Sequence, residues 1–415
     1  MRNRPLVCTV AGLVCAVLCK VKDDSYSVPA TPRSLQHTAL SQSSAAAASS
    51  SAPSSAILAR DASSSQCVHR FEYLLPPHRY ENGGPIYAIA ADAQQVYFRN
   101  LTQVYRVPLT GGQATVISQG PTISLSTHGA IFISGERLLT QAMGESVFMA
   151  APKSGGEWST IIDLTNQKQD ESARLASDAD FDGSNFYWAI GGTMTRGSST
   201  ASTLRTVALS GAAPQTLYKR TGQMAEVTRA GERIVFMHTE PASAEQRQRA
   251  VEYRRPHVQE FPIYGERLLL SVPVTGGEAK ILAHVSRLAA DVVLGVDGSS
   301  VYISGELDHD HTKSGIFKLD ANGSSLERLD ERSLQGRALV AGSNVIFAGS
   351  IELDPRSGTA QEAVFSIPRG GNQPTFVACI PERASVAYAV AGKYLLMSLY
   401  NEPTHLASIA KIELP

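Results

Sequence analysis

The chain has 415 residues, of which 43% are hydrophobic and 18% are charged, so it is long enough to bury one large core or several small cores in series. Lysine and arginine together number 37 against 38 aspartate and glutamate residues, and the formal net charge is -1. This balance lacks the positive field on which binding to a phosphate backbone relies, and it therefore argues against a nucleic-acid-binding protein.

Residues 1–19 carry the pattern of an export signal. Arg2 and Arg4 precede an apolar run that is shorter than the roughly 20 residues of a membrane span. Ordinary secretion is favoured by a small-residue cleavage site ending at Ala30. Lipidation at Cys15 or Cys19 is the alternative, although each follows a large apolar residue. We expect a periplasmic, cell-envelope or secreted protein that contacts a membrane only through this signal or through a lipid anchor.

Residues 20–66 form a second segment of different composition. From Thr31 to Ser65 the chain is mostly serine and alanine and lacks any aromatic residue. Such a segment cannot bury enough apolar area to offset the entropy of ordering it. We therefore predict a disordered tether, followed by a folded part at 67–415.

One four-strand unit repeats along the folded part. The clearest copy is 88–118, in which β-branched and aromatic runs are separated by Gly, Asp, Asn or Pro. Each copy is expected to have an apolar anchor in its second strand. The anchors are Val96-Tyr97-Phe98, Ile131-Phe132-Ile133, Phe186-Tyr187-Trp188, Ile234-Val235-Phe236, Val301-Tyr302-Ile303, Val345-Ile346-Phe347 and Tyr394-Leu395-Leu396. Glycine-containing reversals follow most of the third strands.

Seven copies at spacings of about 35 to 67 residues are typical of blades arranged around an axis. The sequence therefore predicts an all-β protein, a seven-bladed β-propeller of four-stranded antiparallel blades, and we expect it to be a monomer. The last copy stops after its third strand at Pro415. The strand Cys67–Leu75 is expected to complete this blade and close the ring.

This closure would place Cys67 and Cys379 on neighbouring outer strands. In an exported protein, two such cysteines are candidates for a disulfide. Two separately buried thiols are the alternative.

The Gly-Gly repeats, with the segments VYRVPLTGG and LLLSVPVTGG, resemble those of exported bacterial β-propeller repeat proteins. Phe186-Tyr187-Trp188 is also similar to the Tyr-Trp strand of YWTD-type propellers, although the Thr-Asp half of that motif is absent. The resemblance covers roughly residues 67–415. It implies the fold and no particular activity, because propellers serve as enzymes, receptors and scaffolds.

The links between second and third strands vary in length, and in a propeller they emerge on one side of the ring. They are residues 190–203, 238–265, 305–314 and 349–362. The longest link contains a predicted helix, with a capping box formed by Ser243 and Gln246. Its candidate residues for binding an acidic partner or a glycan are Arg247, Arg249, Tyr253, Arg254 and Arg255. A solvated insert folded over the blade is the alternative.

Two polar groups are candidate ligands for a divalent cation. The first is the run Asp308, His309, Asp310 and His311, whose imidazoles and carboxylates suit zinc or a similar ion. A solvated polar loop is the alternative. The second is Asp178 and Asp180, which alternate onto one side of the inner strand of the third blade. An EF-hand is excluded there because Ala189 occupies the position of the required glutamate.

The sequence shows no Gly-rich phosphate loop, cysteine-rich metal framework or nucleophile elbow. It therefore favours an exported, non-catalytic propeller that needs no cofactor and binds a protein, peptide or glycan through the side that carries the insertions. A metal-assisted hydrolase or lyase is the alternative hypothesis, with the ion held either by Asp178 and Asp180 or by His309 and His311.

Overall fold

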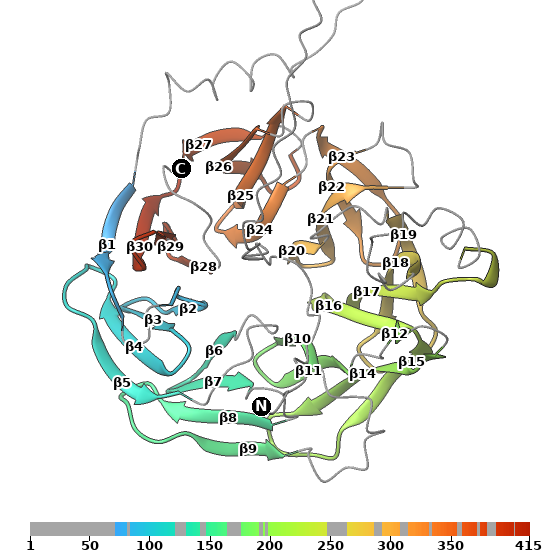
Figure 1. Cartoon of the computed structure of the whole chain (residues 1–415), viewed down its shortest axis with the longest axis horizontal. Helices are drawn as coiled ribbons and strands as arrows, with labels where there is room; N and C mark the ends of the chain where they lie inside the picture. Colours follow the sequence, from blue (N-terminus) through green and yellow to red (C-terminus); the bar gives the residue numbers. More distant parts are fainter. Residues whose placement is uncertain are drawn as a thin grey trace, which may run out of the picture.

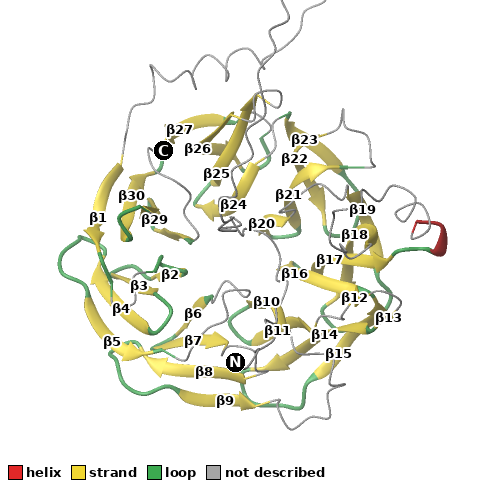
Figure 2. Cartoon of the chain, viewed as in Figure 1, coloured by secondary structure: helices red, strands yellow, loops and turns green. Residues whose placement is uncertain are grey.

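The computed structural model describes residues 71–80, 84–120, 130–141, 147–163, 176–190, 194–195, 198–246, 264–285, 293–307, 314–331, 334–354, 359–371, 374–379, 387–401 and 403–415. Regular structure in these ranges is almost entirely β-strand, with helix at residues 244–246 (Figure 2). Seven four-stranded sheets stand in a ring around a common axis (Figure 1). The predicted seven-bladed propeller of antiparallel blades is confirmed.

The first four blades follow the chain in order, and each begins with its innermost strand. Blade 1 consists of β2 (Ala88–Ala91), β3 (Gln95–Arg99), β4 (Gln103–Pro108) and β5 (Thr115–Gln119). Blade 2 consists of β6 (Ile131–Ser134), β7 (Arg137–Gln141), β8 (Val147–Pro152) and β9 (Ser159–Asp163). Blade 3 consists of β10 (Ala176–Phe181), β11 (Asn185–Ile190), β14 (Ala201–Ala208) and β15 (Gln215–Thr221). Blade 4 consists of β16 (Gln223–Ala230), β17 (Arg233–Pro241), β18 (Tyr264–Pro273) and β19 (Lys280–Val285).

The remaining blades complete the ring. Blade 5 consists of β20 (Val293–Asp297), β21 (Ser300–Glu306), β22 (Ser314–Asp320) and β23 (Leu326–Asp330). Blade 6 consists of β24 (Leu334–Ala341), β25 (Asn344–Asp354), β26 (Thr359–Pro368) and β27 (Thr375–Cys379). Blade 7 consists of β28 (Tyr388–Ala391), β29 (Tyr394–Asn401), β30 (Leu406–Glu413) and β1 (Phe71–His78). A separate two-stranded sheet, β12 (Met194–Thr195) with β13 (Ser198–Ser199), lies within the blade 3 link.

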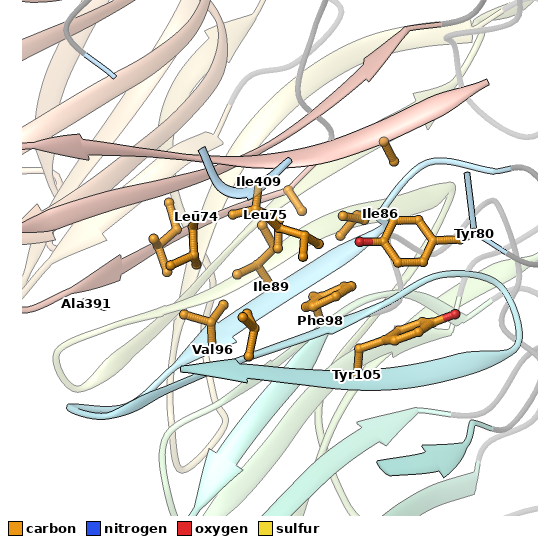
Figure 3. Close-up of a cluster of buried hydrophobic side chains, with 14 residues drawn as sticks. Leu74, Leu75, Tyr80, Ile86, Ile89, Val96, Phe98, Tyr105, Ala391 and Ile409 are labelled. Atoms are coloured by element: carbon orange, nitrogen blue, oxygen red, sulfur yellow. The ribbon is translucent and has the colours of Figure 1, made fainter. Parts of the chain in front are cut away.

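Blade 7 takes its outer strand from the opposite end of the chain. Strand β1 pairs antiparallel with β30. Leu74 and Leu75 of β1 are 2% and 5% exposed and belong to one core cluster with Ile409 of blade 7 and Phe98 of blade 1 (Figure 3). Burying a leucine side chain is worth about 1.5–3 kcal/mol, so β1 contributes to the packing of both blades.

The prediction for the strands of blade 2 is wrong. Ile131-Phe132-Ile133, expected in the second strand, lies in β6, which is the first strand. The second strand is β7, which follows a tight turn at Gly135 with a φ of 55°. The tetrapeptide Ile-Ser-Gly-Glu forms this turn, whereas its second occurrence, at residues 303–306, lies within β21. The same four residues can therefore form either the turn after the first strand or part of the second strand, and the local sequence does not decide which.

The Gly-Gly reversals join consecutive blades. In blade 2, the turn at Gly155 and Gly156 contacts Ile117 on the outer strand of blade 1. Gly156 N donates a hydrogen bond to Ile117 O at 3.1 Å. A Cβ atom at Gly155 would lie 2.7 Å from the same oxygen, and the φ of this residue is 105°. Only glycine accepts this conformation and this approach, which explains why the reversal recurs in the sequence.

Ion pairs join neighbouring blades on the side of the ring that carries the short turns. The acid ends or directly follows the first strand of blade 1, 3 or 5, and the cation belongs to the next blade, 2, 4 or 6. The pairs are Asp92 with Lys153, at 3.0 Å, Asp182 with Arg229, and Asp297 with Arg369. The sequence did not predict the partners of these aspartates on the next blade.

Asp182 makes the most enclosed of these pairs. Its side chain is 6% exposed and that of Arg229 is 30% exposed. Burial alone would raise the pKa of Asp182, but the backbone N–H groups of Asn185 and Ser184 and the hydroxyl of Tyr187 outweigh it, and the pKa lies below its usual value. The carboxylate thus stabilises both its own turn and the seam between blades 3 and 4.

Asp182→Asn is expected to lower the free energy of unfolding at pH 7 by about 2 kcal/mol, because it removes the closer charged partner of Arg229 and leaves only the exposed Glu232 at 3.8 Å. The lowered pKa means that this stabilisation is present above the pKa of the unfolded chain and is lost as the pH falls. The difference between wild type and variant should therefore shrink below about pH 4. Urea unfolding at several pH values measures it. Asp297→Asn is the control, with a smaller expected effect because Arg369 is exposed to solvent. Equal effects of the two substitutions would show that the enclosure of the Asp182 pair adds nothing to its stabilising effect.

Candidate functional site

The links between second and third strands emerge at one end of the ring, here called the insertion-rich side. Two hairpins are prolonged there. Strands β17 and β18 remain paired as far as Pro241 and Tyr264, and β25 and β26 as far as Asp354 and Thr359. In blade 1, by contrast, a short turn joins β3 to β4. The described strands that extend furthest on this side therefore belong to blades 4 and 6.

The blade 4 hairpin is fixed firmly at its base. A Cβ atom at Gly265 would lie 2.5 Å from the carbonyl oxygen of Pro241. The two strands are therefore too close here for any residue other than glycine. Beside this contact, Glu240 of β17 forms an ion pair with Arg220 of β15 in blade 3. The side chains are 39% exposed for Arg220 and 28% exposed for Glu240. The first contact holds the two strands of the hairpin together, and the ion pair joins the hairpin to blade 3.

The predicted capping box is confirmed. Ser243 N donates to Gln246 Oε1 at 2.9 Å, and Gln246 N donates to Ser243 Oγ at 3.1 Å. These reciprocal bonds satisfy two backbone donors at the start of the helix. Figure 2 shows this helix at the outer rim of the ring, beyond the blade 4 sheet.

A buried histidine lies beneath the hairpin. His238 of β17 is 0% exposed and pairs with Met224 of β16 and Leu268 of β18. Burial, and next the positive charge of Arg220, lower the pKa of His238 to about 4. The side chain is therefore neutral at physiological pH, and charging it opposes the folded state.

His238→Leu is expected to make the protein less sensitive to acid. The folded pKa is about 4 and the ordinary value is 6.5, so the unfolded chain binds the proton first as the pH falls. Between pH 7 and pH 5 the wild type should lose about 2 kcal/mol more of its free energy of unfolding than the variant does. Urea unfolding at both pH values gives this difference. A control at the exposed His405, His405→Asn, should leave the loss unchanged. Equal losses in wild type and His238→Leu would show that burial does not lower the pKa of His238 in the folded protein.

The predicted recognition residues of the blade 4 link, Arg247, Arg249, Tyr253, Arg254 and Arg255, lie outside the described residues. So do the predicted cation ligands Asp308, His309, Asp310 and His311. Both assignments stay predictions.

Next to the second of these segments, the described chain contains a pair that the sequence did not predict. His284 Nδ1 of β19 is hydrogen-bonded to Glu266 Oε1 of β18. The following residue, Val285, forms an antiparallel β-bridge with Leu307, the last described residue before Asp308. Glu266 and His284 are distant in the sequence, and only the register of β18 and β19 brings them together.

Asp180 binds the neighbouring blade. Its Oδ2 accepts hydrogen bonds from the backbone N–H of Arg229, at 2.7 Å, and from Thr228 Oγ1, at 3.4 Å. Oδ1 accepts the N–H of Phe181 at 2.8 Å. Burial raises the pKa of Asp180 despite these bonds. The contacts give Asp180 a structural role between blades 3 and 4. Asp178 lies in β10, and its side chain is not among those described, so the cation site at this pair stays a prediction.

The described ranges contain no cluster of three or more histidine, cysteine, aspartate or glutamate side chains arranged to hold a metal ion. In the same part of the chain, no helix has the length and apolar character of a membrane span.

Cys379 ends β27, the outer strand of blade 6, and is 1% exposed. Cys67 lies outside the described residues, before the first residue of β1. The pairing of the two cysteines stays a prediction.

Comparison with known proteins identifies the fold alone. No known protein family and no curated protein matches the sequence. Among solved structures, an oligogalacturonate lyase from Vibrio parahaemolyticus is similar with a TM-score of 0.57 and 11% identity, over 85% of this chain and 95% of that chain. An oligogalacturonate lyase in complex with manganese is similar with a TM-score of 0.53 and 12% identity, over 83% of this chain and 92% of that chain. At such identities, the likeness supports a propeller and no particular activity.

Proposed function

We propose that the chain is an exported, non-catalytic propeller at the cell envelope, tethered by residues 20–66, and that its insertion-rich side recognises a protein, peptide or glycan. The observation that supports this most directly is the prolonged blade 4 hairpin. It is fixed at its base by Gly265 and by the ion pair of Arg220 and Glu240, and it leads into a capped helix. A rigid base that carries long links is the usual arrangement of a recognition surface.

The sequence adds chemistry to this surface. Beyond the capped helix, the link carries Arg247, Arg249, Tyr253, Arg254 and Arg255. Arginine binds carboxylates in a bidentate manner, and tyrosine offers an aromatic face with a polar end. An acidic peptide or an acidic glycan is therefore the class of ligand that this link would bind.

Replacing residues 242–263 by an Asn-Gly turn tests the proposal, because this turn closes a hairpin between Pro241 and Tyr264 without the link. The full chain and the variant are applied to a glycan array and a peptide array. We expect the wild type to retain acidic ligands and the variant to lose at least about tenfold in affinity. Lys393→Ala, on the short-turn side, is the control and should bind normally. Equal binding by wild type and variant would refute the proposal.

A metal-assisted hydrolase or lyase is the second candidate. The observation in its favour is the bridge between Leu307, the last described residue before Asp308, and Val285, which follows His284 in the chain. Metal analysis after purification without chelators tests it. A bound divalent ion that is lost in Asp180→Ala or His311→Ala would favour this candidate, and its absence from the wild type would remove it.

A further inference from the structure

The seam between blades 3 and 4 changes from apolar to polar toward the insertion-rich side. Alternate residues of a strand lie on the same face of its sheet. Strand β17 therefore presents one row of residues to blade 3, namely Ile234, Phe236, His238 and Glu240. The first three are 0% exposed, whereas the side chain of Glu240 is 28% exposed and forms an ion pair with Arg220 of blade 3. The row thus ends in a charged pair at the insertion-rich end of the seam.

Gly222 alone connects blade 3 to blade 4 at this end. Strand β15 ends one residue before it, and β16 begins one residue after it. A Cβ atom at Gly222 would lie 2.4 Å from the carbonyl oxygen of Thr239 and 2.7 Å from Nε2 of His238, and the φ of the residue is 128°. No residue other than glycine accepts this conformation and this approach. The backbone that carries Arg220 is therefore fixed against the strand that carries Glu240.

The ion pair uses only part of the hydrogen-bonding capacity of Arg220. Nη2 donates a hydrogen bond to Glu240 Oε1. Nε and Nη1 have no partner among the described residues, and the side chain is 39% exposed. A guanidinium carries five N–H donors in a planar fork that matches a carboxylate. Because Glu240 already holds this guanidinium in place, it loses less side-chain entropy on binding a ligand than an unpaired arginine does.

Neutral polar side chains lie on both sides of Gly222. Thr221 and Gln223 are exposed, and neither side chain is hydrogen-bonded within the described part of the chain. Gln223 pairs with Thr239, the residue before Glu240. The exposed large hydrophobic residues of the described ranges lie on other outer strands, and they are Tyr73, Val116, Ile281 and Leu326. Hydroxyl and amide groups exchange hydrogen bonds with the hydroxyls of a sugar, whereas an apolar peptide side chain finds no exposed apolar partner at this end of the seam.

We infer that Arg220 binds the carboxylate of an acidic glycan at the insertion-rich end of the seam between blades 3 and 4. A uronate carboxylate would take the free donors of Arg220, and the sugar hydroxyls would bind Thr221 and Gln223. A neutral glycan offers the hydroxyls alone, so Arg220 selects for charge. This inference rests on the proposed recognition function, and it names one class of ligand and the described residues that bind it.

An oligomer of uronate sugars and its methyl ester test the inference, because esterification removes the charge and keeps the sugar hydroxyls. In isothermal titration calorimetry of the full chain, the wild type should bind the acid form at least about tenfold more tightly than the ester. Arg220→Gln should weaken binding of the acid form about tenfold or more and leave binding of the ester unchanged. Arg220→Lys keeps the charge and the pair with Glu240 but lacks the planar fork, so its affinity should lie between the two. Arg137→Gln, at an exposed arginine on the short-turn side, is the matched control and should bind like the wild type.

The possible results separate this inference from the proposed function. Loss of the acid form in Arg220→Gln, with normal binding in Arg137→Gln, supports the site. Normal binding in Arg220→Gln, together with loss in the variant that lacks residues 242–263, would overturn the role of Arg220 and leave the recognition surface standing. A wild type that binds neither acidic glycans nor acidic peptides would overturn both.

Two further results concern the class of ligand. Equal binding of acid and ester by the wild type would overturn the carboxylate site. Binding of acidic peptides, without binding of the uronate oligomer, would overturn the glycan and leave the recognition function standing. Urea unfolding of Arg220→Lys that matches the wild type shows that weaker binding by this variant does not come from misfolding.

Discussion

Trp188→Ala is expected to lower the free energy of unfolding by about 4 kcal/mol, because it removes a large side chain from a tightly packed seam. Trp188 is 0% exposed on β11 of blade 3. Its ring packs edge-on against Phe148 of blade 2, with ring centroids 5.5 Å apart. The cavity would thus open between two blades, where neither sheet can collapse independently to fill it. Urea unfolding monitored by circular dichroism gives the difference.

Trp188→Phe is the matched control for this prediction. Phenylalanine keeps most of the apolar contact with Phe148. The indole Nε1 is buried without a hydrogen-bond partner among the described residues, so no polar contact is lost. We expect a loss below about 1.5 kcal/mol. A similar loss in both variants would show that the apolar packing of Trp188 against Phe148 does not stabilise the seam between blades 2 and 3.

Reduction of the predicted disulfide between Cys67 and Cys379 is expected to destabilise the ring by up to about 5 kcal/mol, the upper bound that loop-closure entropy gives for a very long loop. The two relevant outer strands, β27 and β1, belong to the neighbouring blades 6 and 7 (Figure 1). Cys379 is buried at the end of β27. Urea unfolding with and without reductant, after export to an oxidising compartment, measures the effect.

Cys67→Ser provides the control for the disulfide. It should unfold like the reduced wild type and be insensitive to reductant. Peptide mapping without reduction should join Cys67 to Cys379 in the wild type alone. Two free thiols in the exported protein would rule out the bond.

Much of the fold follows from local sequence. Six of the seven anchors lie in second strands, as predicted, since β-branched runs bounded by glycine and aspartate mark strands and turns regardless of their neighbours. Blade 2 is the exception, because Ile133-Ser134-Gly135-Glu136 repeats a tetrapeptide of blade 5 in another position. Only the pairing of β6 with β7 shows that β6 ends at Ser134 and that a turn follows.

Contacts between distant segments were not predictable in the same way. The partner of Asp182 is Arg229 on the next blade, and neither residue is unusual in its own repeat. The same holds for Glu266 and His284: His284 lies opposite Leu268, and Glu266 reaches it diagonally across the two strands. The capping box at Ser243 was predictable because all of its hydrogen bonds are local.

The most direct test of a recognition surface on the insertion-rich side is hydrogen–deuterium exchange of the full chain with and without an array-selected ligand. We expect slower exchange at the base of the blade 4 hairpin, in peptides that cover 239–242 and 264–267. We expect no change in peptides that cover the short turns at 92–95 and 182–185. Protection confined to those short turns would contradict a recognition surface on the insertion-rich side.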